Sequence, residues 1–141
     1  MKRIILTAGH NGKGTGANGY IDEGAETIVL RDSIADWLKV KYPQIEIITD
    51  KERDNQKLAN IVAWIKGIFR KDDICVDIHF NSSTSEMATG CEAFVPTKYS
   101  GEEMEIAQYL ASCIAKTLGI KNRGVNAFVE VGIMGGKNNN N

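Results

Sequence analysis

The two histidines of this chain are its first candidates for chemistry, because each one follows a short apolar stretch. His10 closes the segment RIILTAGH, and His79 follows the segment DICVDI. Imidazole is the commonest metal ligand among side chains, although a lone histidine is more often structural. Two histidines in matching positions are the pattern that convergence on one metal ion would produce. By itself the pattern leaves metal binding and two separate structural roles both open.

A catalytic zinc site needs a further ligand, which the acidic residues of the N-terminal third can supply. Zinc that does chemistry is commonly held by two histidines and one carboxylate, with the fourth position open. Asp22, Glu23 and Glu26 lie where a glycine-rich segment, residues 9–19, meets a helical stretch. Acidic residues also stabilise a helix N-terminus through its dipole and its free N–H groups. Their positions therefore allow either role.

The periodicity of apolar residues indicates the elements that position these side chains. Short apolar runs predict strands at residues 3–8, 45–48, 74–78, 90–95 and 125–131. Helical spacing predicts helices at residues 25–40, 58–69 and 101–118. The first and third helices are expected to turn two apolar sets toward the core: Ile28, Leu30, Ile34, Ala35, Trp37 and Leu38, and Ile106, Ala107, Leu110, Ile114 and Leu118.

This alternation of strands and helices predicts an α/β fold. We expect a mostly parallel, twisted sheet of about five to six strands with helices on both faces. Ligand sites of such sheets lie beyond the carboxyl ends of the strands, which is where both histidines fall. A chain of 141 residues is expected to form one domain, here over residues 1–135, and the asparagine-rich residues 136–141 are expected to be a disordered tail.

Composition narrows the classes of function. A net charge of -1 gives no bias toward nucleic acid or anionic lipid, and no stretch is long and apolar enough to span a membrane. Cys75, Cys91 and Cys113 are widely spaced, which argues against a disulfide framework and against a thiolate zinc site. The glycine-rich segment does not fit a phosphate-binding P-loop, because Lys13 is followed by Gly14.

Several short motifs follow one another along nearly the whole chain. They read TAGHNGKGTGANG, then an acidic residue, VDIHFNSS, GCE at residues 90–92, NRGV at residues 122–125 and VEVGIM at residues 129–134. Each motif alone is weak, but their joint order resembles the catalytic domain of the zinc N-acetylmuramoyl-L-alanine amidases, the cell-wall amidases of bacterial autolysins and phage endolysins. The predicted domain is therefore expected to be amidase-like.

The resemblance implies a set of zinc ligands. His10 and His79 match the two histidine ligands of the family, and the third ligand there is a glutamate seven residues before a core leucine of the first helix. Glu23 stands seven residues before Leu30, so it fits this register better than Glu26, which remains the second choice.

The resemblance also implies the remaining site residues. Glu130 of the VEVG motif matches the catalytic glutamate, which would accept a proton from water and pass it to the leaving nitrogen. Zinc would make that water acidic enough to react near neutral pH. Asn81, Asn122 and Arg123 are expected to bind substrate or to orient other site residues, since arginine binds carboxylates through two hydrogen bonds. Turn or surface roles are the alternative for all three.

The reaction expected from the resemblance is hydrolysis of the amide between N-acetylmuramic acid and L-alanine in peptidoglycan, with contacts to the stem peptide and the glycan. The alternatives are a zinc-retaining cell-wall binding module without turnover and a zinc carboxypeptidase-type peptidase. We expect a monomer, made in the cytoplasm without a signal peptide and acting on the cell wall, as a prophage lysin or a piece of a larger protein would.

The sequence also departs from the family pattern at its C-terminal end. Residues 126–129 form an unusually short connection between the NRGV motif and Glu130, and a closing C-terminal helix is missing. We therefore expect either an open, reduced site or missing residues.

Overall fold

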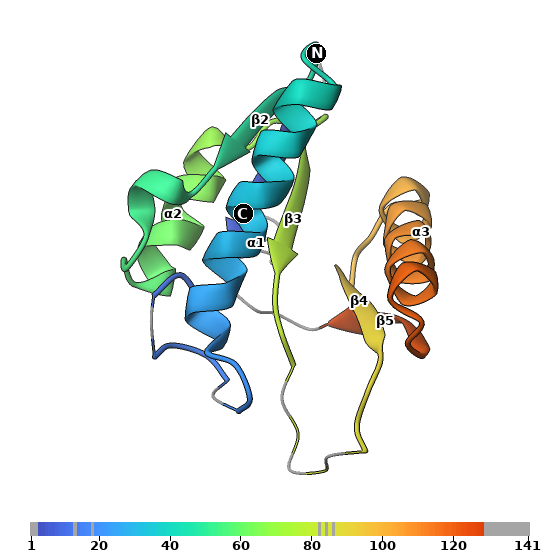
Figure 1. Ribbon diagram of the computed structural model, residues 1–141. Coiled ribbons are helices and arrows are strands. Elements are labelled where there is room, and N and C mark those ends of the chain that lie inside the picture. Colours follow the sequence, from blue (N-terminus) through green and yellow to red (C-terminus); the bar gives the residue numbers. More distant parts are fainter. Residues whose placement is uncertain are drawn as a thin grey trace. The chain divides into compact units, whose positions relative to one another are not determined.

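The computed structural model describes residues 3–12, 14–17, 19–81, 83, 85 and 87–128, and the chain divides into two compact units, Met1–Ser82 and Ser83–Asn141 (Figure 1). The first unit contains β1 (Arg3–Ala8), α1 (Glu23–Lys41), β2 (Glu46–Thr49), the short 3-10 helix η1 (Lys51–Arg53), α2 (Leu58–Ile68) and β3 (Ile74–Ile78). The second contains β4 (Cys91–Pro96), α3 (Gly101–Leu118) and β5 (Asn122–Phe128).

The first unit is built on a three-stranded parallel sheet in the order β2-β1-β3. In the central strand, Ile5 pairs with Ile48 on one side and with Cys75 on the other. Ile5 and Leu6 are buried, together with Ile61 and Ile65 of α2. Figure 1 shows α1 running alongside these strands, and it contacts β1 and β2. The order places the carboxyl ends of β1 and β3 side by side at one edge.

The buried face of α1 is polar, which differs from the apolar face expected from the sequence. Its buried residues recur mainly at four-residue spacing: Glu23, Gly24, Thr27, Arg31 and Ala35. By contrast, Leu30 is 36% exposed and Trp37 is 58% exposed. Hydrophobicity patterns misjudge this helix because buried polar groups become tolerable when each one has a hydrogen-bond partner.

The second unit pairs β4 with β5 in parallel, and α3 packs against both strands. Helix α3 begins with a capping box, in which Ser100 and Glu103 each accept a backbone N–H of the other residue. Its buried residues are Ala107, Ala111 and Ala115. Leu110, Ile114 and Leu118 are at least 37% exposed, which corrects their predicted inward orientation. Small residues at four-residue spacing make up the stripe of α3 that is buried.

The structure confirms an α/β fold with parallel strands. The five described strands are distributed over two sheets, of three and two strands. β5 begins at Asn122, earlier than expected, and the predicted strand end at residues 129–131, Glu130 and the tail lie outside the described residues. The prediction of one domain over residues 1–135 stays a prediction. Among the described residues, no helix combines the length and the hydrophobicity needed to cross a bilayer.

Candidate metal centre

The pairing of β1 with β3 brings the two histidines together. Ala8 is opposite Ile78, and the backbone N–H of Gly9 donates to the carbonyl of Ile78 over 2.8 Å, which carries the pairing past the end of β1. His10 and His79 follow directly. Their ring centroids are 5.2 Å apart and the ring planes meet at 83°. The two rings are therefore close enough to direct nitrogen atoms at one metal ion.

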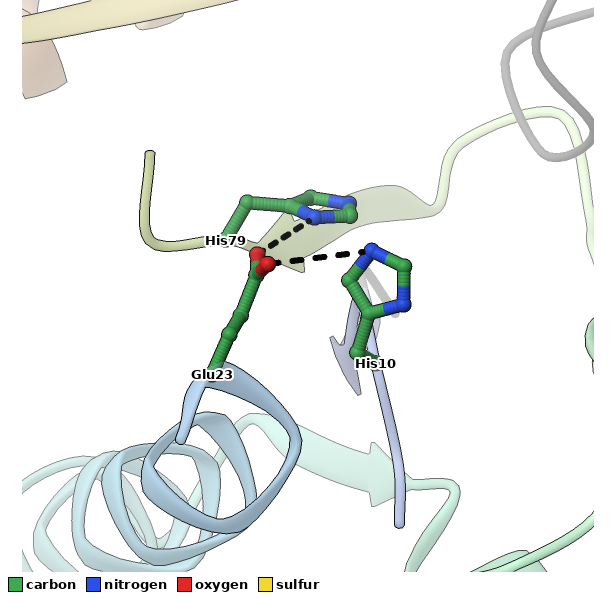
Figure 2. A group of neighbouring side chains, drawn as sticks. All are labelled: His10, Glu23 and His79. Carbon is green, nitrogen blue, oxygen red and sulfur yellow. Dashed lines mark hydrogen bonds and ion pairs between the residues drawn. The ribbon is translucent and has the colours of Figure 1, made fainter. Parts of the chain in front are cut away.

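Glu23 is the carboxylate that lies beside both rings. It is the first residue of α1, after the N-cap Asp22, and its side chain is only 5% exposed. Its Oε1 lies 3.1 Å from Nδ1 of His79, and its Oε2 lies 3.8 Å from Nε2 of His10 (Figure 2). Glu26, the other candidate, is exposed and does not belong to this cluster of described residues.

Backbone N–H groups hold the Glu23 carboxylate in place, and a hydroxyl group lies between the main-chain carbonyls of Glu23 and His10. The N–H of Ala17 donates to Oε2 over 2.7 Å, and the N–H of Phe80 donates to Oε1 over 2.9 Å. The buried hydroxyl of Thr27 lies 2.6 Å from the carbonyl oxygen of His10 and 2.8 Å from that of Glu23, within donating distance of both. The orientation of the carboxylate is thus set by the fold, before any ion binds.

Two glycines make room for this cluster. A Cβ on Gly9 would overlap the ring of His79. A Cβ on Gly16 would lie 2.6 Å from Oε2 of Glu23 and from the ring of His10, and Gly16 has a left-handed φ of +75°. The glycine-rich segment is therefore required for the close approach of backbone to the site, not only for its flexibility.

The far nitrogen of His79 contacts a carboxylate that the sequence analysis did not select. Nε2 of His79 lies 3.1 Å from Oδ2 of Asp77, and the buried hydroxyl of Thr7 donates to Oδ1 of Asp77 over 2.6 Å. The hydrogen bond with Asp77 raises the pKa of His79, although burial lowers it. Alternation along a strand could have indicated Asp77, because residues two apart point to the same side.

The cluster fits a zinc ion. One ligand atom from each of His10, Glu23 and His79 lies within 4.8 Å of the others. Tetrahedral zinc with bonds of about 2.0–2.2 Å places its ligand atoms roughly 3.3–3.6 Å apart. Nδ1 of His79 is 3.1 Å from Oε1 of Glu23, and Nε2 of His10 is 3.8 Å from Oε2, so each ring nitrogen has a carboxylate oxygen near that separation. The two histidine side chains are 37% and 45% exposed, so both rings are accessible to solvent.

A buried arginine ties α1 to the loop that follows β2. Arg31 is fully buried, and its Nη1 lies 2.7 Å from Oδ1 of Asp50 and 2.7 Å from Oδ1 of Asp54. Oδ1 of Asp50 also accepts the N–H of Ala8 over 3.3 Å, at the end of β1. Burial raises the pKa of Asp50, and Arg31 opposes that shift. The network thereby supports the backbone just before His10.

The other predicted site residues lie elsewhere in the chain. Asn81 is exposed on the loop after β3, two residues beyond His79. In the second unit, Asn122 donates to Ser112 over 3.2 Å and accepts the N–H of Gly124 over 2.8 Å. Arg123 is paired with Glu92 at 3.5 Å. These contacts all lie within the second unit, and the expected roles of Asn122 and Arg123 stay predictions.

Comparison with known proteins identifies relatives of the chain. A family model described as N-acetylmuramoyl-L-alanine amidase matches residues 4–134. No curated protein gives a significant match. A crystal structure described as N-acetylmuramoyl-L-alanine amidase from Clostridium difficile 630 is similar, with 21% sequence identity and a TM-score of 0.76. The match covers 90% of this chain and 69% of that chain, and at this identity the likeness concerns the fold alone.

Proposed function

Because this chain belongs to the N-acetylmuramoyl-L-alanine amidase family, we propose that it hydrolyses its amide substrate with a zinc ion held by His10, Glu23 and His79. The activity of the chain is that of the family, hydrolysis of an amide bond of peptidoglycan. The family is zinc-dependent. The proposal adds the identity of the ligands and the roles of the residues around them.

The observation that carries the proposal is the placement of the Glu23 carboxylate between two histidine rings. Its oxygens lie 3.1 Å from one ring nitrogen and 3.8 Å from the other, and each oxygen also accepts a backbone N–H. Two neutral imidazoles and one carboxylate form a donor set that suits zinc. A buried carboxylate with so little exposure also calls for a positive partner, because an unpaired buried charge is costly.

Metal binding and proton transfer are proposed to belong to different residues of the chain. When bound, zinc supplies Lewis acidity, which makes water a nucleophile near neutral pH and polarises an amide carbonyl. His10, Glu23 and His79 orient that centre, and the exposed side of both rings leaves it accessible. Glu130 is proposed to accept the proton from water and to deliver it to the leaving nitrogen. This role rests on the VEVG motif, since Glu130 lies outside the described residues.

We propose that the substrate bond is the amide between N-acetylmuramic acid and L-alanine, and that the chain contacts both stem peptide and glycan at the cell wall. Asn81 is proposed to contact the substrate because it follows His79 on the same loop. Arg123 is proposed to bind a stem-peptide carboxylate. Such a carboxylate must compete with Glu92, which already lies 3.5 Å from the Arg123 guanidinium.

The test combines zinc content with product analysis. The wild-type chain is expected to retain stoichiometric zinc and to release stem peptides with a free L-alanine N-terminus from purified peptidoglycan. Glu23→Gln and His79→Ala are expected to lose both zinc and activity. Glu26→Gln, on the same helix but exposed, is the matched control and is expected to keep both. Equal zinc content in Glu23→Gln, His79→Ala and wild type would refute the ligand assignment.

A further inference from the structure

We propose that Asp77 is a positioning residue that fixes the orientation of the His79 ring and selects Nδ1 as the atom that binds zinc. This inference rests on the proposed zinc site. Oδ2 of Asp77 lies 3.1 Å from Nε2 of His79, and the opposite ring nitrogen, Nδ1, lies 3.1 Å from Oε1 of Glu23. The ring is therefore held between two carboxylates, one of which belongs to the metal cluster.

The contact with Asp77 determines which nitrogen carries the proton. An ionised carboxylate only accepts hydrogen bonds, so Nε2 must donate a proton to Asp77. With the proton on Nε2, the lone pair of a neutral imidazole resides on Nδ1, which lies 3.1 Å from Oε1 of Glu23. Carboxylates that accept the second N–H of a ligating histidine orient the ring and raise its basicity.

Asp77 is itself held in place from the neighbouring strand. Thr7 pairs with Asp77 in the register of β1 and β3, and its hydroxyl donates to Oδ1 of Asp77 over 2.6 Å. Thr7 is fully buried. With one oxygen occupied by Thr7, the other oxygen of Asp77 is directed to the His79 ring. The described residues thus form a continuous chain of contacts from Thr7 through Asp77 and His79 to Glu23.

Asp77 is placed to support the metal and not to bind it. The metal-binding cluster among the described residues contains His10, Glu23 and His79, and Asp77 does not belong to it. Its contact is with the ring nitrogen opposite the one that faces Glu23. Removal of Asp77 should therefore weaken zinc binding without removing a ligand.

The test is zinc affinity, measured by competition with a colorimetric chelator on the whole chain. Asp77→Ala is expected to bind zinc about 10–100-fold more weakly than wild type, and Asp77→Asn, which keeps an acceptor oxygen, is expected to lose less. Asp72→Ala removes an exposed carboxylate just before the same strand and should leave the affinity unchanged. Thr7→Val, which frees the Asp77 carboxylate, provides a second variant if Asp77→Ala does not fold, and it should also weaken binding.

Nitrogen NMR of labelled histidine supplies an independent readout in the zinc-loaded protein. The expected spectrum shows His79 coordinated through Nδ1 and protonated at Nε2. Coordination through Nε2, or an Asp77→Ala affinity within about twofold of wild type, would overturn the inference while leaving the zinc site intact. A wild-type chain that binds no zinc would instead overturn the proposed function, and this inference with it.

Discussion

Replacing Arg31 with methionine is expected to lower the free energy of unfolding by about 3–5 kcal/mol at neutral pH, the usual cost of breaking a buried ion pair by removing one partner. Arg31 and Asp50 are both fully buried. Without the guanidinium, the Asp50 carboxylate would keep backbone donors alone, among them the N–H of Ala8 at 3.3 Å, and Oδ2 already has no hydrogen-bond partner among the described residues. Asp32 and Asp54 are 27% and 23% exposed and can be hydrated, so Asp50 accounts for most of the cost.

The pH dependence of this variant has a defined sign. Burial already raises the pKa of Asp50, and loss of Arg31 raises it further. An aspartate whose pKa is higher in the folded state reduces stability as pH rises above its unfolded pKa of about 3.9, up to its folded pKa. Acidification should therefore restore stability to the variant, by at most about 1.4 kcal/mol per pH unit and about 2.7 kcal/mol between about pH 7 and pH 5.

The assay is urea unfolding, monitored by circular dichroism, at about pH 7 and about pH 5. Wild type, Arg31→Met, Asp50→Asn and the double variant form a cycle, and the double variant is expected to regain most of the stability lost in Arg31→Met. Lys39→Met, an exposed change on the same helix, should stay within about 0.5 kcal/mol of wild type. If the stability losses of the two single variants add in the double variant, the reasoning about Asp50 is refuted. The same holds if the stability of Arg31→Met depends on pH as that of wild type does.

Three further predictions concern the metal site. Gly16→Ala should weaken zinc binding by at least about tenfold in chelator competition, because its Cβ would lie 2.6 Å from Oε2 of Glu23. Gly14→Ala is the control, since Gly14 has a similar φ of +79° and open space around it, and this variant should bind zinc like wild type. Thr27→Val should cost about 1–3 kcal/mol in urea unfolding by removing a buried hydroxyl donor that lies within reach of the His10 and Glu23 carbonyl oxygens, and equal stability of Thr27→Val and Thr27→Ser would contradict that role. Glu130→Gln should slow peptidoglycan hydrolysis about 10²–10⁴-fold while zinc affinity stays unchanged, and parallel loss of zinc would argue against a role in proton transfer.

The sequence alone determined the elements that carry the two histidines. Short apolar runs set β1 and β3, and the residues that follow them are His10 and His79. Parallel strands of an α/β sheet place their carboxyl ends at one edge, so the meeting of the two rings was predictable without coordinates. The choice of Glu23 over Glu26 required the register of the family, because both residues stand in the first turn of α1 and both suit a helix N-terminus.

Tertiary structure alone decided which polar residues are buried and what they contact. Thr27 and Arg31 lie on the inner face of α1, where apolar residues were expected. Other segments supply their partners: the carbonyl of His10 for Thr27, and the carboxylates of Asp50 and Asp54 for Arg31. Thr7 and Asp77 meet across two strands that are 70 residues apart in the chain. Local periodicity depends on neighbours along the backbone, whereas these contacts depend on strand register and helix placement, which arise only once the segments pack together.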